Sequence, residues 1–102
     1  MKQIPIEEIV IDAENRLLIR PKFGSGDNYE YIYRDASGVT WIVQLGCLGA
    51  REPEKWNHFD LFRQIILAVQ GEYGELLLVT PETKWSNVPS ALESEIKEWK
   101  QK

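Results

Sequence analysis

Two runs of residues constrain the fold of this chain more than any other feature of its sequence. They lie on either side of Gly38, at residues 29–34 and 39–45, and in each run large apolar or aromatic side chains occupy every second position. Such alternation is typical of β-strands that cover a core on one face. Glycine takes a positive φ without steric cost, so Ala36 to Gly38 fit a three-residue hairpin loop. A two-residue loop would turn the tyrosines away from the apolar side of the second run. The sequence therefore predicts a hairpin that pairs Tyr33 with Trp41, Tyr31 with Val43 and Tyr29 with Leu45.

An earlier segment predicts a second hairpin of the same design. Strands Ile4 to Ile11 and Arg16 to Pro21 flank a short turn in which Asn15 can adopt the left-handed conformation. With the same loop length, one face pairs Ile11 with Leu17 and Ile9 with Ile19. The other face pairs Val10 with Leu18 and Glu8 with Arg20, the last as a cross-strand ion pair.

The remainder of the chain predicts two helices and one more strand. Pro53 suits the first turn of a core helix that runs to about Gln70 and stops at Gly71. Glu75 to Thr80 read as a buried strand, and a last helix begins with a capping box made by Ser90 and Glu93 and carries Leu92, Ile96 and Trp99 on one stripe. We expect a single α+β domain over residues 1–102, in the order ββββαβα. Its mostly antiparallel five-stranded sheet is built from two β-hairpins plus one later strand, with one long core helix and a short C-terminal helix.

Charge and composition narrow the classes of partner. The net charge is −4 and is spread evenly, and no basic patch of the kind that binds nucleic acid stands out. No apolar segment approaches the roughly 20 residues that span a bilayer. Glu7, Glu8 and Asp12 occupy the region where a secretory signal would be apolar. We therefore expect a cytoplasmic protein that binds neither nucleic acid nor membranes.

Few residues suggest catalysis or a metal site. The chain has one cysteine, Cys47, and one histidine, His58, which is too few for zinc. The two side chains could approach as a thiolate–imidazole pair, but no third residue that would orient them is evident. We expect no cofactor, no metal and a protein that is not an enzyme.

The second face of the predicted sheet carries apolar residues that need cover. Val10 and Leu18 oppose each other in one hairpin, Ile32 and Ile42 do so in the other, and Leu76 or Leu77 extends the stripe. Full burial of each such side chain stabilises the fold by roughly 1.5–3 kcal/mol, so exposure of the whole stripe to water would forgo several times this free energy. The cover is either the last helix or a second copy of the protein or a foreign partner.

These features favour a non-catalytic protein-interaction module. We expect a homodimer or a small bacterial accessory protein such as an immunity-type inhibitor, with Trp56, Trp85, Val10, Leu18, Ile32 and Ile42 at the partner-binding surface. The alternative is a small-molecule binding protein with an apolar pocket between the sheet and the core helix. In that pocket Tyr29, Tyr31 or Tyr33 would offer a hydroxyl to the ligand.

Overall fold

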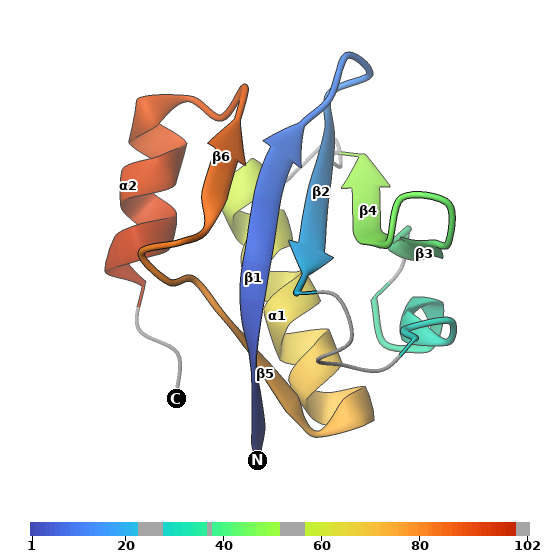
Figure 1. The fold of residues 1–102 in the computed structure, drawn as a ribbon. Helices are drawn as coiled ribbons and strands as arrows, with labels where there is room; N and C mark the ends of the chain where they lie inside the picture. The colour runs from blue at the N-terminus through green and yellow to red at the C-terminus, as the bar shows by residue number, and fades with distance from the viewer. Residues whose placement is uncertain (23–27, 37, 52–56, 100–102) are drawn as a thin grey trace.

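A mixed β-sheet with both α-helices on one of its faces forms the framework of the molecule (Figure 1). The computed structural model describes residues 1–22, 28–36, 38–51 and 57–99. Within these ranges the strands are β1 (Lys2–Ile11), β2 (Arg16–Pro21), β3 (Thr40–Ile42), β4 (Cys47–Arg51), β5 (Glu75–Leu78) and β6 (Lys84–Ser86). The helices are the 3₁₀ helix η1 (Ile32–Arg34), α1 (His58–Tyr73) and α2 (Ser90–Glu98). The fold is α+β, as predicted.

The β1–β2 hairpin has the predicted register. Ile11 pairs with Leu17, Ile9 with Ile19, Val10 with Leu18 and Glu8 with Arg20. Asn15 has a φ of 64°, and the Asp12 carboxylate accepts hydrogen bonds from the backbone N–H groups of Glu14 and Arg16. The turn is thus fixed by local chemistry, which is why the sequence specifies it.

The predicted pairing of the tyrosine run with residues 39–45 is wrong. Residues 29–36 form a loop and η1, and the second hairpin joins β3 to β4 through a turn at Val43–Gly46. Gly49 lies in β4, and a Cβ at this position would come within 2.7 Å of Ile42 and 2.8 Å of Leu18. The glycine of β4 therefore makes room for two neighbouring side chains.

Among the described residues the sheet is mixed and has six strands, whereas five mostly antiparallel strands were predicted. Its order is β3-β4-β2-β1-β5, and β6 also pairs with β1. Both β5 and β6 run parallel to β1, β5 along its first half and β6 along its second. A bulge between Ile6 and Glu8 separates the two halves, and the buried Thr83 hydroxyl donates to the Ile6 carbonyl there over 2.8 Å. The long strand β1 therefore pairs with two short strands, β5 and β6.

Helix α1 fills the centre of the core. It begins after Asn57, whose side chain accepts a hydrogen bond from Asp60 N–H, and ends at Gly74 in the left-handed conformation. The predicted end at Gly71 was three residues early, and the predicted start at Pro53 lies outside the described residues. Six buried side chains of α1 face the sheet: Leu61, Phe62, Ile65, Ile66, Ala68 and Val69.

Helix α2 packs beside α1, and no helix formed by the described residues lies over the opposite face of the sheet (Figure 1). Leu92 and Ile96 are buried, and the Trp99 ring meets Phe59 and Phe62 edge-on at centroid distances of 6.4 and 6.1 Å. This confirms the predicted apolar stripe. The predicted capping box is wrong, because Pro89 takes the N-cap position without a side-chain hydrogen bond. Neither α-helix of the described chain is long and apolar enough to cross a membrane.

Candidate interaction surface

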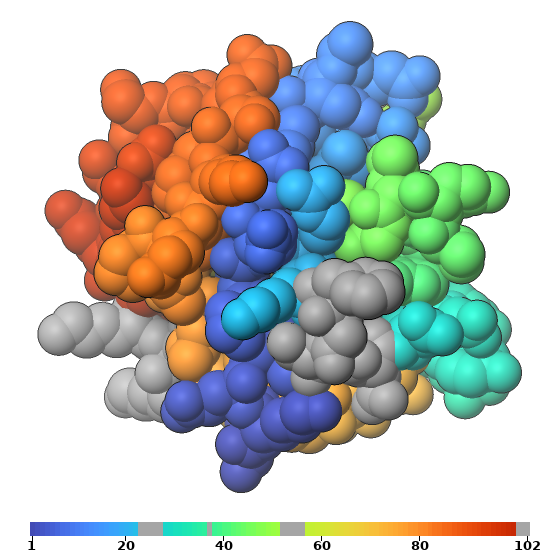
Figure 2. All heavy atoms as spheres, in the orientation of Figure 1, coloured from blue at the N-terminus to red at the C-terminus, as the bar shows by residue number. Residues whose placement is uncertain are grey.

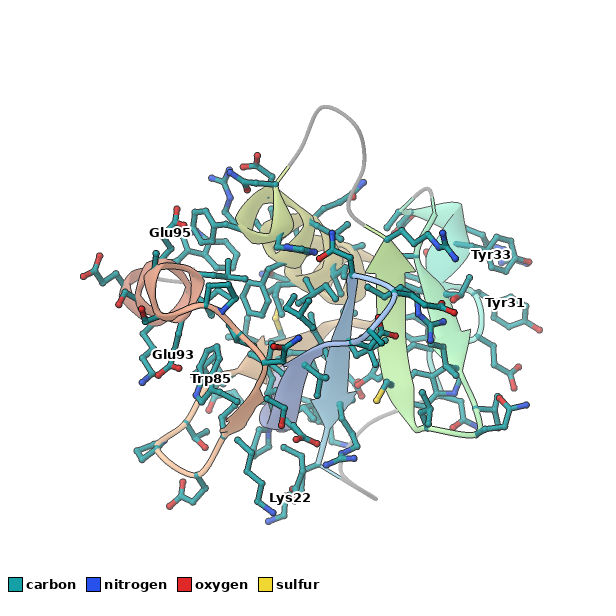
Figure 3. The ribbon with its side chains drawn as sticks, turned by 90° about the horizontal axis from the view of Figure 1, so that it is seen from above. Lys22, Tyr31, Tyr33, Trp85, Glu93 and Glu95 are labelled. Atoms are coloured by element: carbon teal, nitrogen blue, oxygen red, sulfur yellow. The ribbon has the colours of Figure 1, made fainter. Side chains whose placement is uncertain are left out.

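Exposed large apolar side chains gather on one flank of the molecule. Among the described residues six such side chains are exposed, and four of them belong to this flank. They come from η1 with the residue before it and from the β3–β4 turn, which lie on the same side of the sheet in Figures 1 and 3. Figure 2 shows the two segments, teal and green, next to each other on the molecular surface. We call this surface the aromatic flank and define it by Tyr31, Tyr33, Val43 and Leu45.

The aromatic flank rests on a firmly anchored segment. Tyr29, Ile32, Ala36 and Val39 are fully buried, at intervals of three or four residues. The Tyr29 ring packs edge-on against Trp41 and Tyr73, and its hydroxyl donates to the buried Glu75 carboxylate over 2.7 Å. The backbone N–H of Tyr31 donates to the Tyr73 hydroxyl over 3.0 Å. The exposed tyrosines therefore project from a backbone that the core holds in place.

Charged side chains of both signs surround the two exposed tyrosines. Glu30, Arg34 and Asp35 are exposed, and the Arg34 guanidinium lies 4.4 Å from the centroid of the Tyr31 ring. Within the part of the chain that the structure describes, neither Glu30 nor Arg34 forms an ion pair. The Tyr31 and Tyr33 rings lie 6.4 Å apart between these charges. Figure 3 shows both rings projecting away from the sheet.

The second face of the sheet carries part of the predicted apolar stripe. Val10, Leu18 and Ile42 share this face by register, and Leu18 is 7% exposed although neither α1 nor α2 lies over it. The glycine at position 49 lets Leu18 and Ile42 come together, and an ion pair of 2.6 Å between Arg20 and Glu8 runs alongside. Of the two alternatives for the cover of this face, the last helix is excluded, because α2 packs beside α1. The stripe is narrow enough for neighbouring side chains to shield much of it.

Three other residues of the predicted partner surface lie elsewhere. Ile32 is not on a strand but is buried in the core through η1, so its assignment to the second face is wrong. Trp85 lies in β6 and packs half-buried against the core, with Lys97 Nζ 5.5 Å from its ring centroid. Trp56 lies outside the described residues.

The three tyrosines of the predicted pocket do not share a cavity. Tyr29 is buried and its hydroxyl is hydrogen-bonded to Glu75, whereas Tyr31 and Tyr33 face solvent with about half of their surface exposed. A groove of about 560 Å³ lies elsewhere, between α1, α2 and the end of β5. Its apolar lining includes Phe62, Leu78, Val79, Ile96 and Trp99.

Cys47 and His58 do not form a pair. The Cys47 thiol is buried on the second face of the sheet and donates to the Leu45 carbonyl, and burial raises its pKa. His58 Nε2 lies 3.1 Å from the Asn15 carbonyl oxygen. Asn15 precedes Arg16, which pairs with Arg51 at the last residue of β4, whereas Cys47 is the first residue of that strand. The two ends of β4, Cys47 and Arg51, are four residue steps apart, which corresponds to about 13 Å along a strand. Among the described residues no group of three or more His, Cys, Asp or Glu side chains could hold a metal ion.

The fold and this surface define a small α+β domain that presents an aromatic and charged flank. The chain belongs to the family of the integron cassette protein Hfx_Cass5, whose model matches residues 4–83. A solved structure, described as integron cassette protein Hfx_Cass5 from the mobile metagenome of the North West Arm sewage outfall, is 32% identical to it. That match covers 94% of this chain and 93% of the other, with a TM-score of 0.45. A comparison with curated proteins gives no match.

Proposed function

We propose that this protein is a non-catalytic protein-interaction module that acts in the cytoplasm and binds its partner through the aromatic flank. The observation that carries the proposal concerns the six large apolar side chains that are exposed within the described ranges: four of them gather on one anchored segment and the turn beside it. Tyrosine and arginine are enriched among the residues that dominate binding energy at protein interfaces. Side chains on a backbone that is already fixed require less ordering of the chain on binding. The flank supplies two tyrosines with an arginine stacked on one of them.

The charge of the chain supports a protein partner. The net charge is −4, and Arg34 is flanked by the acidic residues Glu30 and Asp35. Phosphate backbones require a concentration of basic side chains, which this flank does not supply. The matching solved protein is described as a product of an integron cassette in a mobile metagenome. A small accessory role, such as that of an immunity-type inhibitor, fits a module of this size.

Selective capture tests the proposal. Tyr31→Ser/Tyr33→Ser removes both exposed rings, and Leu67→Ser removes an apolar side chain of α1 that is 56% exposed and is not part of the aromatic flank. Each variant and the wild type are immobilised and exposed to the lysate of the native host, and bound proteins are identified by mass spectrometry. We expect a defined protein, either a foreign protein or this chain itself, to bind wild type and Leu67→Ser but not the double variant. Equal capture by all three proteins would contradict the proposal.

A small apolar ligand in the groove beside α2 is the second candidate function. The groove volume of about 560 Å³ is within the range of ligand sites, and Trp99 offers a ring for stacking. A thermal-shift screen of apolar compounds tests it, because a ligand that binds the folded state raises the melting temperature. The Ile96→Ala variant should lose any such shift. A shift that persists in that variant would place the ligand elsewhere.

A further inference from the structure

The sequence around the 3₁₀ helix has the same pattern of residue types in both directions from Ile32. Around Ile32 the order is Glu30, Tyr31, Ile32, Tyr33 and Arg34, so a tyrosine and then a charged residue stand on each side. The two charges have opposite signs. Two such segments placed antiparallel would bring each tyrosine against a tyrosine and each charge against its opposite.

The structure presents these residues in the required way. Ile32 is fully buried and fixes the centre of the segment, while the other four side chains are exposed. The Tyr31 and Tyr33 rings are neighbours, with centroids 6.4 Å apart. The Arg34 guanidinium stacks on Tyr31 and forms no ion pair within the described residues. The charges at both ends of the segment are therefore available to an external partner.

We infer that the partner of the aromatic flank is a second copy of this chain, bound about a twofold axis that passes between the two exposed tyrosine rings. In this arrangement Tyr31 of one copy faces Tyr33 of the other, and Arg34 of one copy pairs with Glu30 of the other. A twofold interface uses the same patch on both subunits, so the patch must be complementary to itself. The inference rests on the proposed function and names the partner of the same surface.

The exposed area fits a weak dimer. Tyr31 and Tyr33 are 48% and 55% exposed, so together they offer about the area of one whole tyrosine, on the order of 200 Å². Val43 and Leu45, which are 68% and 48% exposed, add apolar area on the same flank. A standard interface buries about 800 Å² on each partner, of which this area would form the apolar centre. We expect a dissociation constant in the micromolar range.

The overall charge does not prevent this contact. Each copy has a net charge of −4, but charges farther apart than about 8 Å are largely screened at physiological ionic strength. Near the twofold axis the cation of Arg34 balances the carboxylate of Glu30 on each copy. Asp35 is directed toward α1, where its Oδ2 would lie 3.8 Å from a Cβ at position 71.

Sedimentation velocity over a wide range of concentrations tests the dimer. We expect the wild type and Leu67→Ser to associate with the same dissociation constant, and Tyr31→Ser/Tyr33→Ser to associate at least about tenfold more weakly. All three proteins should give the same far-ultraviolet circular dichroism, because the substituted side chains are exposed. Association of the double variant as strong as that of the wild type would overturn the inference.

A charge swap tests the twofold geometry itself. Arg34→Glu leaves carboxylates at both ends of the segment, and Glu30→Arg leaves cations at both ends. Each single variant should associate about tenfold more weakly than the wild type. An equimolar mixture of the two should form mixed dimers, because each Glu of one copy then meets an Arg of the other. A mixture that associates no better than the single variants would exclude this pairing.

Failure of the dimer and failure of the proposed function give different results. If the wild type is monomeric at all concentrations but a foreign protein is captured through the aromatic flank, the second copy is excluded and the interaction module stands. If the wild type is monomeric and nothing is captured through the flank, both proposals fail.

Discussion

Replacing Tyr29 by Phe removes one buried hydroxyl and leaves its ring in place. That hydroxyl donates to Glu75 over 2.7 Å, and Glu75 is 4% exposed. The substitution therefore removes a donor from a carboxylate that water barely reaches. Hydrogen bonds to charged groups contribute about 1.5–3 kcal/mol, so we expect Tyr29→Phe to lower the free energy of unfolding by about 2 kcal/mol. The edge-on contacts with Trp41 and Tyr73 should persist in the variant.

Urea denaturation and thermal melting measure this loss. For a domain of this size a change of 1 kcal/mol shifts the melting temperature by about 4–8 °C, so the variant should melt about 8–16 °C lower. Tyr33→Phe is the matched control, because Tyr33 is 55% exposed and its loss of a hydroxyl should change stability by less than about 0.5 kcal/mol. If Tyr29→Phe were as stable as Tyr33→Phe, the buried bond would not anchor this segment and the argument would be refuted.

Three further predictions test the sheet and its turn. Gly49→Val should lower the free energy of unfolding by about 1–3 kcal/mol in urea, because a Cβ at this position would come within 2.7 Å of Ile42; unchanged stability would show that the site is not crowded. Burial raises the pKa of Asp12, but hydrogen bonds and the charge of Arg16 outweigh it and lower that pKa below its ordinary value. The stabilising charge is thus present above about pH 4 and lost below it, so the stability difference between the wild type and Asp12→Asn should shrink as the pH falls through this range, and a constant difference would exclude the charge effect. Because burial raises the pKa of Cys47, alkylation by iodoacetamide at neutral pH should be slow in the folded protein and complete in urea; rapid modification of the folded protein would contradict its burial.

The first hairpin could be predicted from the sequence because its determinants are local. Asp12 and Asn15 fix the turn within a few residues, and the alternation of the flanking strands then sets every pair from Ile11 with Leu17 onward. Helix α1 was predicted for a similar reason, since its apolar periodicity extends over several turns. Its ends were less accurate. Gly71 resembles a stop signal, but the left-handed residue that ends the helix is Gly74.

The parallel strands could not be predicted from local patterns. β5 and β6 pair with β1, which lies about 70 residues earlier in the chain, and nothing within these short segments reveals their direction. The signal for β6 is especially weak, because its three residues include Trp85 and two polar side chains. Its place depends on Thr83, which satisfies the Ile6 carbonyl at the bulge of β1. Only the folded arrangement brings these two groups together.

The misreading of the tyrosine run explains why the aromatic flank was not found from the sequence. Tyr29, Tyr31 and Tyr33 have the spacing of a strand, but burial follows Tyr29, Ile32 and Ala36, with the spacing of a helical turn. Both patterns fit so short a segment, and the choice between them depends on distant partners such as Glu75. The strand interpretation buries all three tyrosines, whereas the helical turn buries the first and exposes the other two. The same change of period that removes the predicted hairpin therefore creates the surface on which the proposed interaction depends.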